Sequence, residues 1–275
     1  MTTTQSELGI SIARLKKDLK DASRLMSANE VRYLIDGYYL IQDHRKAVRN
    51  QIHSLSANKE PTYLLEWLAE QAETLESQVR NALKNWTESS PIGQWSQSIV
   101  GIGPVISAGL LAHIDMNKAT TVGKIWRFAG LDPSSRWEKG KKRPWNADLK
   151  VLCWKIGESF VRQGDKEDNI YFKLYAERKQ LEISRNESGD YTEQAKLILS
   201  NKNWRKDSIA KAHYEIGKLP PAHIHARAKR YAVKMFLSHW HHVAYTIHYK
   251  KDPPIPYAIA FLGHSHVVPV PNWPM

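Results

Sequence analysis

Apolar residues recur at helical spacing from the start of the chain. Within residues 1–27 they alternate steps of four and three, at Leu8, Ile12, Leu15, Leu19, Ala22 and Met26. This spacing places them on one face of an amphipathic helix. Thr4 followed by Glu7 is a candidate capping box at its start, and Ser27 followed by Glu30 is a second one that opens the next helix. The sequence therefore predicts a short N-terminal helix and then a separate, longer one.

Residues 28–90 carry a heptad pattern on two successive segments. In the first segment the repeating positions are Leu34, Ile41, Val48 and Leu55, preceded at a distance of three residues by Val31, Tyr38, Arg45 and Ile52. Arg45 is the polar exception, and such a residue can fix the register of a heptad helix. After the loop Ser56–Pro61 the same spacing returns at Leu65, Leu68, Ala72, Leu75, Val79, Ala82 and Trp86. We therefore expect an antiparallel helical hairpin. Heptads alone leave open whether its apolar stripe packs within the chain or forms a coiled coil between protomers.

The pattern changes after Ser89–Gly93, where Ser, Pro and Gly interrupt the helical spacing. Residues 91–248 are expected to form one helical domain of short helices, a helix over Asp165–Arg185 and a long helix over His223–His248. Residues 249–275 are punctuated by proline and are expected to be an extended tail. The predicted fold class is mainly α: an amphipathic helix, a heptad hairpin, and a helix-hairpin-helix-containing domain with a long C-terminal helix.

The charge balance favours a polyanionic partner. The 275 residues contain 40 Lys and Arg against 28 Asp and Glu, a formal net charge of +12, and such a surface attracts phosphate. No apolar run approaches the ~20 residues of a membrane-spanning helix, and the start MTTTQSELG lacks the features of a signal peptide. The single cysteine, Cys153, excludes an internal disulfide. We expect a cytoplasmic protein with no membrane partner and no cofactor.

The stretch from Ser98 to Ile114, SIVGIGPVISAGLLAHI, predicts an anion-binding turn. Gly101-Ile102-Gly103 precedes a helix that begins near Pro104, and proline is tolerated at a first helical position. The unpaired N–H groups at a helix start, together with the positive end of the helix dipole, favour a phosphate. The small residues Ala108, Gly109 and Ala112 would let this helix lie close against the preceding one. We interpret the pattern as a helix-hairpin-helix that contacts the nucleic-acid backbone through Gly101, Ile102, Gly103 and Val105; the alternative is a plain tight turn.

The next segment concentrates positive charge. Between residues 124 and 155 the cations are Lys124, Arg127, Arg136, Lys139, Lys141, Lys142, Arg143, Lys150 and Lys155, opposed by Asp132, Glu138 and Asp148. Trp126, Trp137, Trp145 and Trp154 are interleaved with them and offer planar faces for stacking or packing. Its centre, WEKGKKRPW, is expected to be a loop. We name residues 133–146 the basic loop and expect it to extend the anion-binding turn into a phosphate-binding track, although a solvated surface loop would look the same.

These motifs resemble a known family. GIGPVISAGLLAHI, followed by WRFAGLDP, a Gly-containing basic loop and a helix, is similar to the C-terminal domain of the DEDD-type insertion-sequence transposases, the bridge-RNA-guided recombinases. NIYFKLYAERK and HARAKRYAVKMFL resemble the closing helices of that domain, and the heptad hairpin resembles its preceding coiled coil. The resemblance covers residues 30–245 and is strongest over 99–142. It implies DNA binding and descent from a recombinase.

Two departures from the family argue against strand cleavage by this chain. The family's N-terminal RuvC-like domain carries four metal-binding acids, whereas here only one amphipathic segment precedes the hairpin. The family's nucleophilic serine lies in a Tyr-x-Ser-Gly context after the AGL-x-P turn, and matching Trp137–Gly140 onto that context places Lys139 at the serine position. Lysine has no hydroxyl for a phosphodiester link. Ser134 and Ser135, just upstream, are the alternative nucleophiles.

The C-terminal part is rich in histidine, at His223, His225, His239, His241, His242, His248, His264 and His266. Residues three apart on a helix share a face, so His239 and His242 are candidate metal ligands, and His264 and His266 are candidates to complete their site. A metal bound there would suit a hydrolytic nuclease. The competing interpretation is that these rings pack and hydrogen-bond. Partial protonation of these rings below their reference pKa of ~6.5 would add positive charge and tighten phosphate binding.

The sequence thus favours a DNA-binding derivative of a transposase, without autonomous cleavage, in recombination or transposition. Its expected partners are duplex or branched DNA, with RNA as a further candidate, and a second copy of the chain through the heptad helices; nucleoid association would follow. The alternatives are an active recombinase or nuclease that uses Ser134, Ser135 or a histidine-bound metal, and an assembly protein that condenses nucleic acid.

Overall fold

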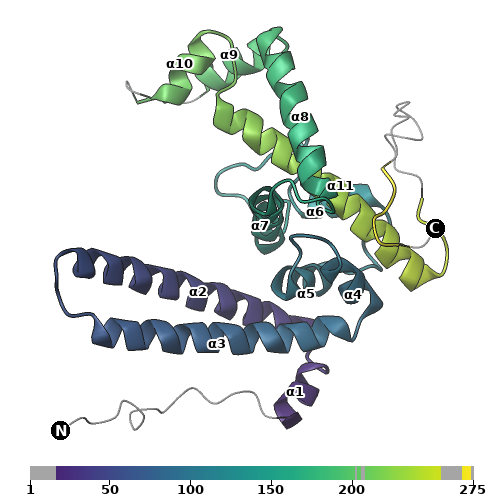
Figure 1. Ribbon diagram of the computed structural model, residues 1–275. Coiled ribbons are helices and arrows are strands. Elements are labelled where there is room, and N and C mark those ends of the chain that lie inside the picture. The colour runs from purple at the N-terminus through teal and green to yellow at the C-terminus, as the bar shows by residue number, and fades with distance from the viewer. Residues whose placement is uncertain (1–16, 202, 206–207, 255–267, 274–275) are drawn as a thin grey trace. The chain divides into compact units, whose positions relative to one another are not determined.

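The computed structural model describes residues 17–201, 203–205, 208–254 and 268–273, and these residues form a mainly α fold (Figure 1). The chain forms two compact units. The first contains the residues up to Gln97 together with Gly103–Asp115, and the second contains Ser98–Ile102 together with the residues from Met116 onward. The chain therefore passes from one unit to the other inside the predicted hairpin turn. None of the described helices is both long enough and apolar enough to cross a membrane.

The first unit is built on the predicted helical hairpin. Its helices are α1 (Lys17–Ser23), α2 (Ala28–Ala57), α3 (Tyr63–Glu88), α4 (Pro91–Gln97) and α5 (Pro104–His113). α2 and α3 lie side by side along their length (Figure 1). The Ser27 side chain accepts a hydrogen bond from the Glu30 amide at 3.2 Å and caps α2, as the sequence predicts. The Thr4–Glu7 capping box and the apolar residues Leu8, Ile12 and Leu15 lie outside the described residues.

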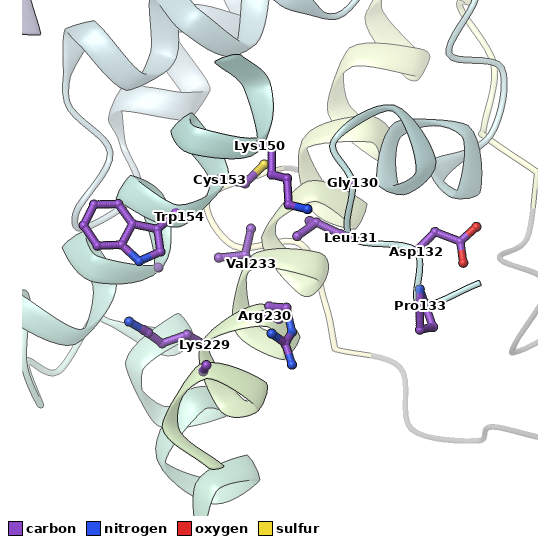
Figure 2. Close-up of a pocket in the computed structure, with 12 residues that line it drawn as sticks. Gly130, Leu131, Asp132, Pro133, Lys150, Cys153, Trp154, Lys229, Arg230 and Val233 are labelled. Atoms are coloured by element: carbon purple, nitrogen blue, oxygen red, sulfur yellow. The ribbon is translucent and has the colours of Figure 1, made fainter. Parts of the chain in front are cut away.

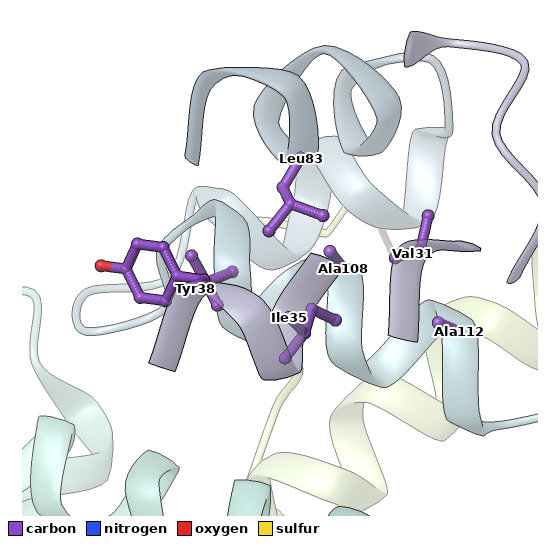
Figure 3. Close-up of a cluster of buried hydrophobic side chains, with 7 residues drawn as sticks. Val31, Ile35, Tyr38, Leu83, Ala108 and Ala112 are labelled. Atoms are coloured by element: carbon purple, nitrogen blue, oxygen red, sulfur yellow. The ribbon is translucent and has the colours of Figure 1, made fainter. Parts of the chain in front are cut away.

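The hairpin and α5 share one apolar core. Val31, Ile35 and Tyr38 of α2 meet Leu83 of α3 and three residues of α5, namely Val105, Ala108 and Ala112 (Figure 3). Ala108 is fully buried, so α5 lies close against the hairpin because its side chains there are small. The sequence assigned Ala108 and Ala112 to contact with the preceding helix, and the structure instead places them in the hairpin core.

Arg45, the polar residue of the heptad pattern, forms an ion pair inside the hairpin. Arg45 Nε donates to Glu76 Oε2 across the two helices at 2.6 Å, and Gln42 Nε2 donates to Glu76 Oε1 at 3.0 Å. The Arg45 and Glu76 side chains are only 21% and 12% exposed. A slip of one helix along the other would leave these charges buried and unpaired, so the pair specifies the register. At these positions the stripe packs within the chain.

Two helical glycines of this unit predict opposite responses to one substitution. A Cβ on Gly93 would lie 2.0 Å from the Thr87 carbonyl oxygen, whereas a Cβ on Gly37 would meet nothing within 4 Å. We expect Gly93→Ala to lower the free energy of unfolding by about 3 kcal/mol, since backbone must move. Gly37→Ala should raise it by about 0.5–1 kcal/mol, because alanine restricts the unfolded chain and favours the helix. Urea unfolding followed by circular dichroism measures both, and equal effects would contradict this account.

The second unit is organised around its longest helix. Its helices are α6 (Val122–Phe128), α7 (Ala147–Gln163), α8 (Ile170–Glu187), α9 (Thr192–Ser200), α10 (Ile209–Glu215) and α11 (Pro221–Tyr249). α11 packs along α8 and also contacts α6 and α7 (Figure 1). At the centre the rings of Phe160 and Tyr171 stack with centroids 4.7 Å apart, and Phe236 meets both rings edge-on. Side chains from α7, α8 and α11 thus join in one aromatic core.

The predicted long helices are present with shifted ends. The helix predicted over His223–His248 is α11, and the helix predicted over Asp165–Arg185 begins later, at Ile170. The delay comes from Asn169, which is fully buried and accepts a hydrogen bond from the Phe172 amide at 3.2 Å while its amide donates to the Phe160 carbonyl at 3.1 Å. Asn169 therefore caps α8 and ties it to the end of α7.

A buried carboxylate joins three helices of this unit. Glu182 of α8 is 1% exposed and accepts from Arg178 Nε at 2.7 Å and from Arg227 Nε of α11 at 2.6 Å. The Tyr191 hydroxyl, at the start of α9, donates to the same carboxylate. Burial alone would raise the pKa of Glu182, but the hydrogen bonds from Tyr191, Arg227 and Arg178 together lower it below its usual value. The group is therefore a charged tie between α8, α9 and α11.

Candidate nucleic-acid interface

The glycine-flanked turn between α4 and α5 is largely structural at its first two residues. Gly101 has φ +93°, and a Cβ there would lie 3.1 Å from Cδ1 of Phe160. Its carbonyl accepts a hydrogen bond from Ser159 Oγ at 2.6 Å. The Ile102 amide donates to the Ile99 carbonyl at 3.0 Å, and the Ile102 side chain is buried. The Gly101 carbonyl and the Ile102 amide thus take part in hydrogen bonds that hold the turn closed.

The start of α5 has the open donors that an anion needs. Gly103 is the exposed N-cap residue, with Pro104 in the first helical position as predicted. No side chain caps this end, and within the described residues the amides of Gly103, Val105 and Ile106 have no hydrogen-bond partner. A Cβ on Gly103 would meet nothing within 4 Å. Val105 can contribute only its amide, because its side chain lies in the hairpin core. The helix start therefore offers backbone N–H groups and the positive dipole end.

α6 ends in a C-cap motif, and the basic loop follows it. The amide of Gly130, at φ +65°, donates to the Arg127 carbonyl at 3.1 Å, and the Leu131 amide donates to the Trp126 carbonyl at 2.8 Å. These two bonds define a Schellman C-cap, for which glycine is the favoured residue. A Cβ on Gly130 would lie 2.9 Å from both Lys150 Cδ and Trp145 Cγ. Gly130 therefore lets the chain turn while the beginning of α7 packs against it.

The basic loop contains no helix, as predicted, and presents its cations to solvent. Trp137 Nε1 donates to the Lys141 carbonyl at 2.6 Å, which closes the loop, and the Arg143 guanidinium lies 5.5 Å from the Trp137 ring centroid. Lys141 pairs with Glu138 at 2.6 Å, but both side chains are exposed, so this pair is weak. The described residues place no carboxylate within ion-pairing distance of the remaining loop cations, Arg136, Lys139, Lys142 and Arg143.

The other predicted contact residues lie beside this loop in sequence. Lys124 and Arg127 are exposed on α6, and the Lys124 ammonium donates to Thr120 Oγ1 at 2.8 Å. Lys150, on α7, is half-buried with its ammonium 3.9 Å from the Trp145 ring centroid. Within the described part of the chain, Arg127 and Lys150 also have no ion-pairing carboxylate. The positive charge of this segment is therefore mostly unneutralised.

The two candidate nucleophiles form a local turn. The Ser134 hydroxyl and amide donate to Asp132 Oδ1 at 2.8 and 2.9 Å, and the Ser135 amide donates to the Asp132 carbonyl at 3.2 Å. The hydrogen bonds from the Ser134 amide and hydroxyl lower the pKa of Asp132. A carboxylate with a lowered pKa is a weak base, so this contact orders the turn and does little to activate Ser134 as a nucleophile.

His239, one of the candidate metal ligands, is a buried packing residue. The Tyr171 hydroxyl donates to His239 Nδ1 at 2.8 Å, and His239 Nε2–H donates to the Val268 carbonyl at 3.0 Å, so both ring nitrogens are used. The described residues contain no cluster of three or more His, Cys, Asp or Glu side chains suited to a metal ion. His264 and His266 lie outside the described residues. Neither ring nitrogen of His239 is therefore free to bind a metal ion, so His239 cannot join His242 in the predicted metal site.

Four histidines of the C-terminal part have a pKa lower than that of an ordinary histidine. Burial lowers the pKa of His239 to about 4, and it lowers the pKa of His223, His225 and His241 as well. Tyrosine hydroxyls contact Nδ1 of His225 and His223 at 2.7 and 3.2 Å. At the pH where an ordinary histidine is half protonated, these four rings carry less positive charge. Their contribution to the charge is therefore moved to lower pH than the reference pKa of ~6.5 predicts.

The structure also contains a pocket that the sequence pattern does not indicate. Its volume is about 410 Å³, and it is lined by the turn after α6, by α7 and by α11 (Figure 2). Lys150 and Trp154 come from the basic segment, whereas Lys229, Arg230 and Val233 come from α11. Gly157 lets α7 approach α11, since a Cβ there would lie 3.2 Å from Val233. Only the tertiary fold brings these distant segments together.

Comparison with family models, curated proteins and solved structures finds no match to this chain. The similarity to the DEDD-type insertion-sequence transposases therefore stays a hypothesis that rests on the quoted motifs.

Proposed function

We propose that this protein binds nucleic acid through the sugar-phosphate backbone, with duplex DNA as its main partner. The observation that carries the proposal is the set of exposed, unneutralised cations on α6 and in the basic loop. Lysine and arginine side chains of this kind bind phosphates by releasing counterions, whatever the base sequence. Trp137, which is 44% exposed, adds an aromatic surface beside Arg143.

The start of α5 is proposed as a second backbone contact. The open amides of Gly103, Val105 and Ile106 can donate to phosphate oxygens without reading bases. Gly101 and Ile102 support this contact indirectly, by closing the turn that precedes it.

Gly103→Val tests this contact. Gly103 has φ −91° and ψ 178°, which any residue adopts, and its Cβ position is open, so the variant should stay folded. The added methyl groups would block a phosphate from the amides, and we expect at least a tenfold loss of duplex affinity, about 1.4 kcal/mol. Fluorescence anisotropy with a labelled duplex measures it. Gly37→Val, which adds the same side chain in open space on α2, is the control. Wild-type affinity of the Gly103 variant would show that the turn is only structural.

The wider role in recombination or transposition rests on the motif resemblance alone, and nucleoid association in the cytoplasm would follow from DNA binding. RNA and a second copy of the chain stay further proposed partners. Val31, Tyr38 and Leu83 pack within the first unit, so a second copy would use apolar residues that stay exposed, such as Leu40, Trp67 and the heptad residue Leu75.

The function is tested by binding measured across a salt series, with duplex, single-stranded and branched DNA and with structured RNA. We expect the logarithm of the duplex affinity to fall linearly with the logarithm of the salt concentration. The affinity should vary little among unrelated sequences. Binding that is insensitive to salt would refute the proposal. Nicking of supercoiled plasmid or a covalent protein–DNA adduct in the same samples would instead establish a recombinase or nuclease.

A further inference from the structure

The pocket between the α6–α7 turn, α7 and α11 has two cations without a carboxylate partner. Lys150 projects from α7 and Arg230 from α11 (Figure 2). No carboxylate of the described residues lies within ion-pairing distance of either side chain. Lys229 differs, because its ammonium pairs with Glu158. The Asp132 carboxylate also belongs to the lining, and the hydrogen bonds that it accepts from Ser134 favour its negative form. Lys150 and Arg230 outnumber it, so the pocket carries a net positive charge.

Partial burial disfavours the charged forms of both cations. Burial lowers the pKa of Lys150, and the positive charges of Arg143 and Arg230 lower it further. Burial lowers the pKa of Arg230, and the positive charge of Arg227 lowers it further, whereas the negative charge of Glu182 raises it. Two cations that line one partly desolvated pocket favour the binding of an anion, since its negative charge would stabilise both.

The remaining walls of the pocket are apolar. Leu131, Cys153, Trp154 and Val233 contribute them. Burial raises the pKa of the Cys153 thiol to about 12, so this residue is a neutral wall and not a nucleophile. Trp154 is 60% exposed, and the Lys229 ammonium lies 6.0 Å from its ring centroid. A volume of about 410 Å³ lies in the ~300–1,000 Å³ range of small-molecule sites.

We propose that this pocket takes one unpaired nucleotide, with its phosphate between Lys150 and Arg230 and its base against Trp154 and the apolar wall. A ligand with a flat ring and an anionic group matches an apolar wall beside two cations. A paired, stacked base cannot enter such a pocket, so the nucleotide is either free or unpaired within a strand. The inference rests on the proposed function for its choice of a nucleotide over other ligands that combine a ring with an anion.

The first arm of the test uses free ligands. Isothermal titration with adenosine monophosphate should show binding, whereas inorganic phosphate and adenosine alone should each bind more weakly. Arg230→Gln and Trp154→Ala should each weaken adenosine monophosphate about tenfold or more, since each removes one of the two interactions. Arg162→Gln, which removes a positive charge from α7 outside the pocket, should leave the affinity unchanged. Equal losses in the Arg230 and Arg162 variants would overturn the proposal, because general charge would then explain binding.

The second arm uses a perfect duplex and the same duplex with one unpaired nucleotide. The wild-type chain should prefer the bulged duplex, and Arg230→Gln should lose this preference while it binds the perfect duplex as Arg162→Gln does. Salt-dependent duplex binding with neither a bulge preference nor monophosphate binding would overturn the pocket assignment and leave the backbone function standing. Monophosphate binding without any duplex binding would refute the backbone function and identify a free nucleotide as the ligand. Circular dichroism melting of each variant confirms that it is folded.

Discussion

Changing Lys141, Lys142 and Arg143 together to alanine is expected to weaken duplex binding to a similar degree on unrelated sequences. The slope of log affinity against log salt should become shallower by up to about 2.7, at ~0.9 for each phosphate that the variant no longer neutralises. The three side chains are exposed in the basic loop, and only Lys141 has an ion-pair partner, Glu138. The loop should keep its shape, because Trp137 hydrogen-bonds to the backbone carbonyl of residue 141, which alanine retains. Fluorescence anisotropy at five or more salt concentrations measures both quantities.

A matched control separates a local contact from the general effect of charge. Lys196, Lys211 and Lys218 lie on or beside α9 and α10, away in sequence from the basic loop, and their triple change to alanine removes the same net charge. We expect this variant to change the slope little, since long-range attraction is screened within ~10 Å at 0.1 M salt. If both triple variants show the same reduction in affinity and slope, the basic loop is not the interface.

Glu182→Gln is expected to lower the free energy of unfolding by about 3 kcal/mol, because it leaves two partly buried guanidinium groups without their anion. The affected groups are Arg178 and Arg227, which both pair with this carboxylate at 2.6 Å. Glu193→Gln is the control: Glu193 pairs with Lys196 at 2.8 Å, but both side chains are exposed. Loss of this exposed ion pair should lower the free energy of unfolding by less than about 1 kcal/mol. Urea unfolding compares the three proteins, and a small effect at Glu182 would show that the network is dispensable.

The stability difference between the wild-type protein and Glu182→Gln should depend on pH. The pKa of Glu182 is lower in the folded chain than its usual value near ~4.3, so the folded state binds this proton less readily than the unfolded state. The stability that Glu182 contributes is therefore complete above that value and is lost as pH falls through the lowered pKa. We expect the stability difference between wild type and Glu182→Gln to shrink below about pH 4. A difference that is constant down to pH 3 would contradict the assignment.

Local patterns in the sequence predicted the helical elements because they depend on neighbouring residues. Apolar spacing identified α2, α3 and α11, Ser27 marked the start of α2, and Pro104 marked the start of α5. The start of α8 was placed too early, because its boundary depends on hydrogen bonds of Asn169 with both Phe160 and Phe172. Likewise, the weakly periodic region after Asn186 contains α9 and α10, which pack against each other around Tyr191, Ala195 and Tyr214.

The sequence by itself determined the mainly α fold class and the concentration of charge in the basic loop, and it identified Arg45 as the polar residue in the heptad pattern. These follow from side-chain spacing and composition along a short stretch of chain. Only the tertiary structure decided which donors of the Gly101–Gly103 turn stay open, and that His239 is fully bonded. It alone also brought Lys150 and Arg230 to one pocket. Burial, hydrogen-bond partners and the meeting of distant residues depend on how helices pack, and no local pattern contains that information.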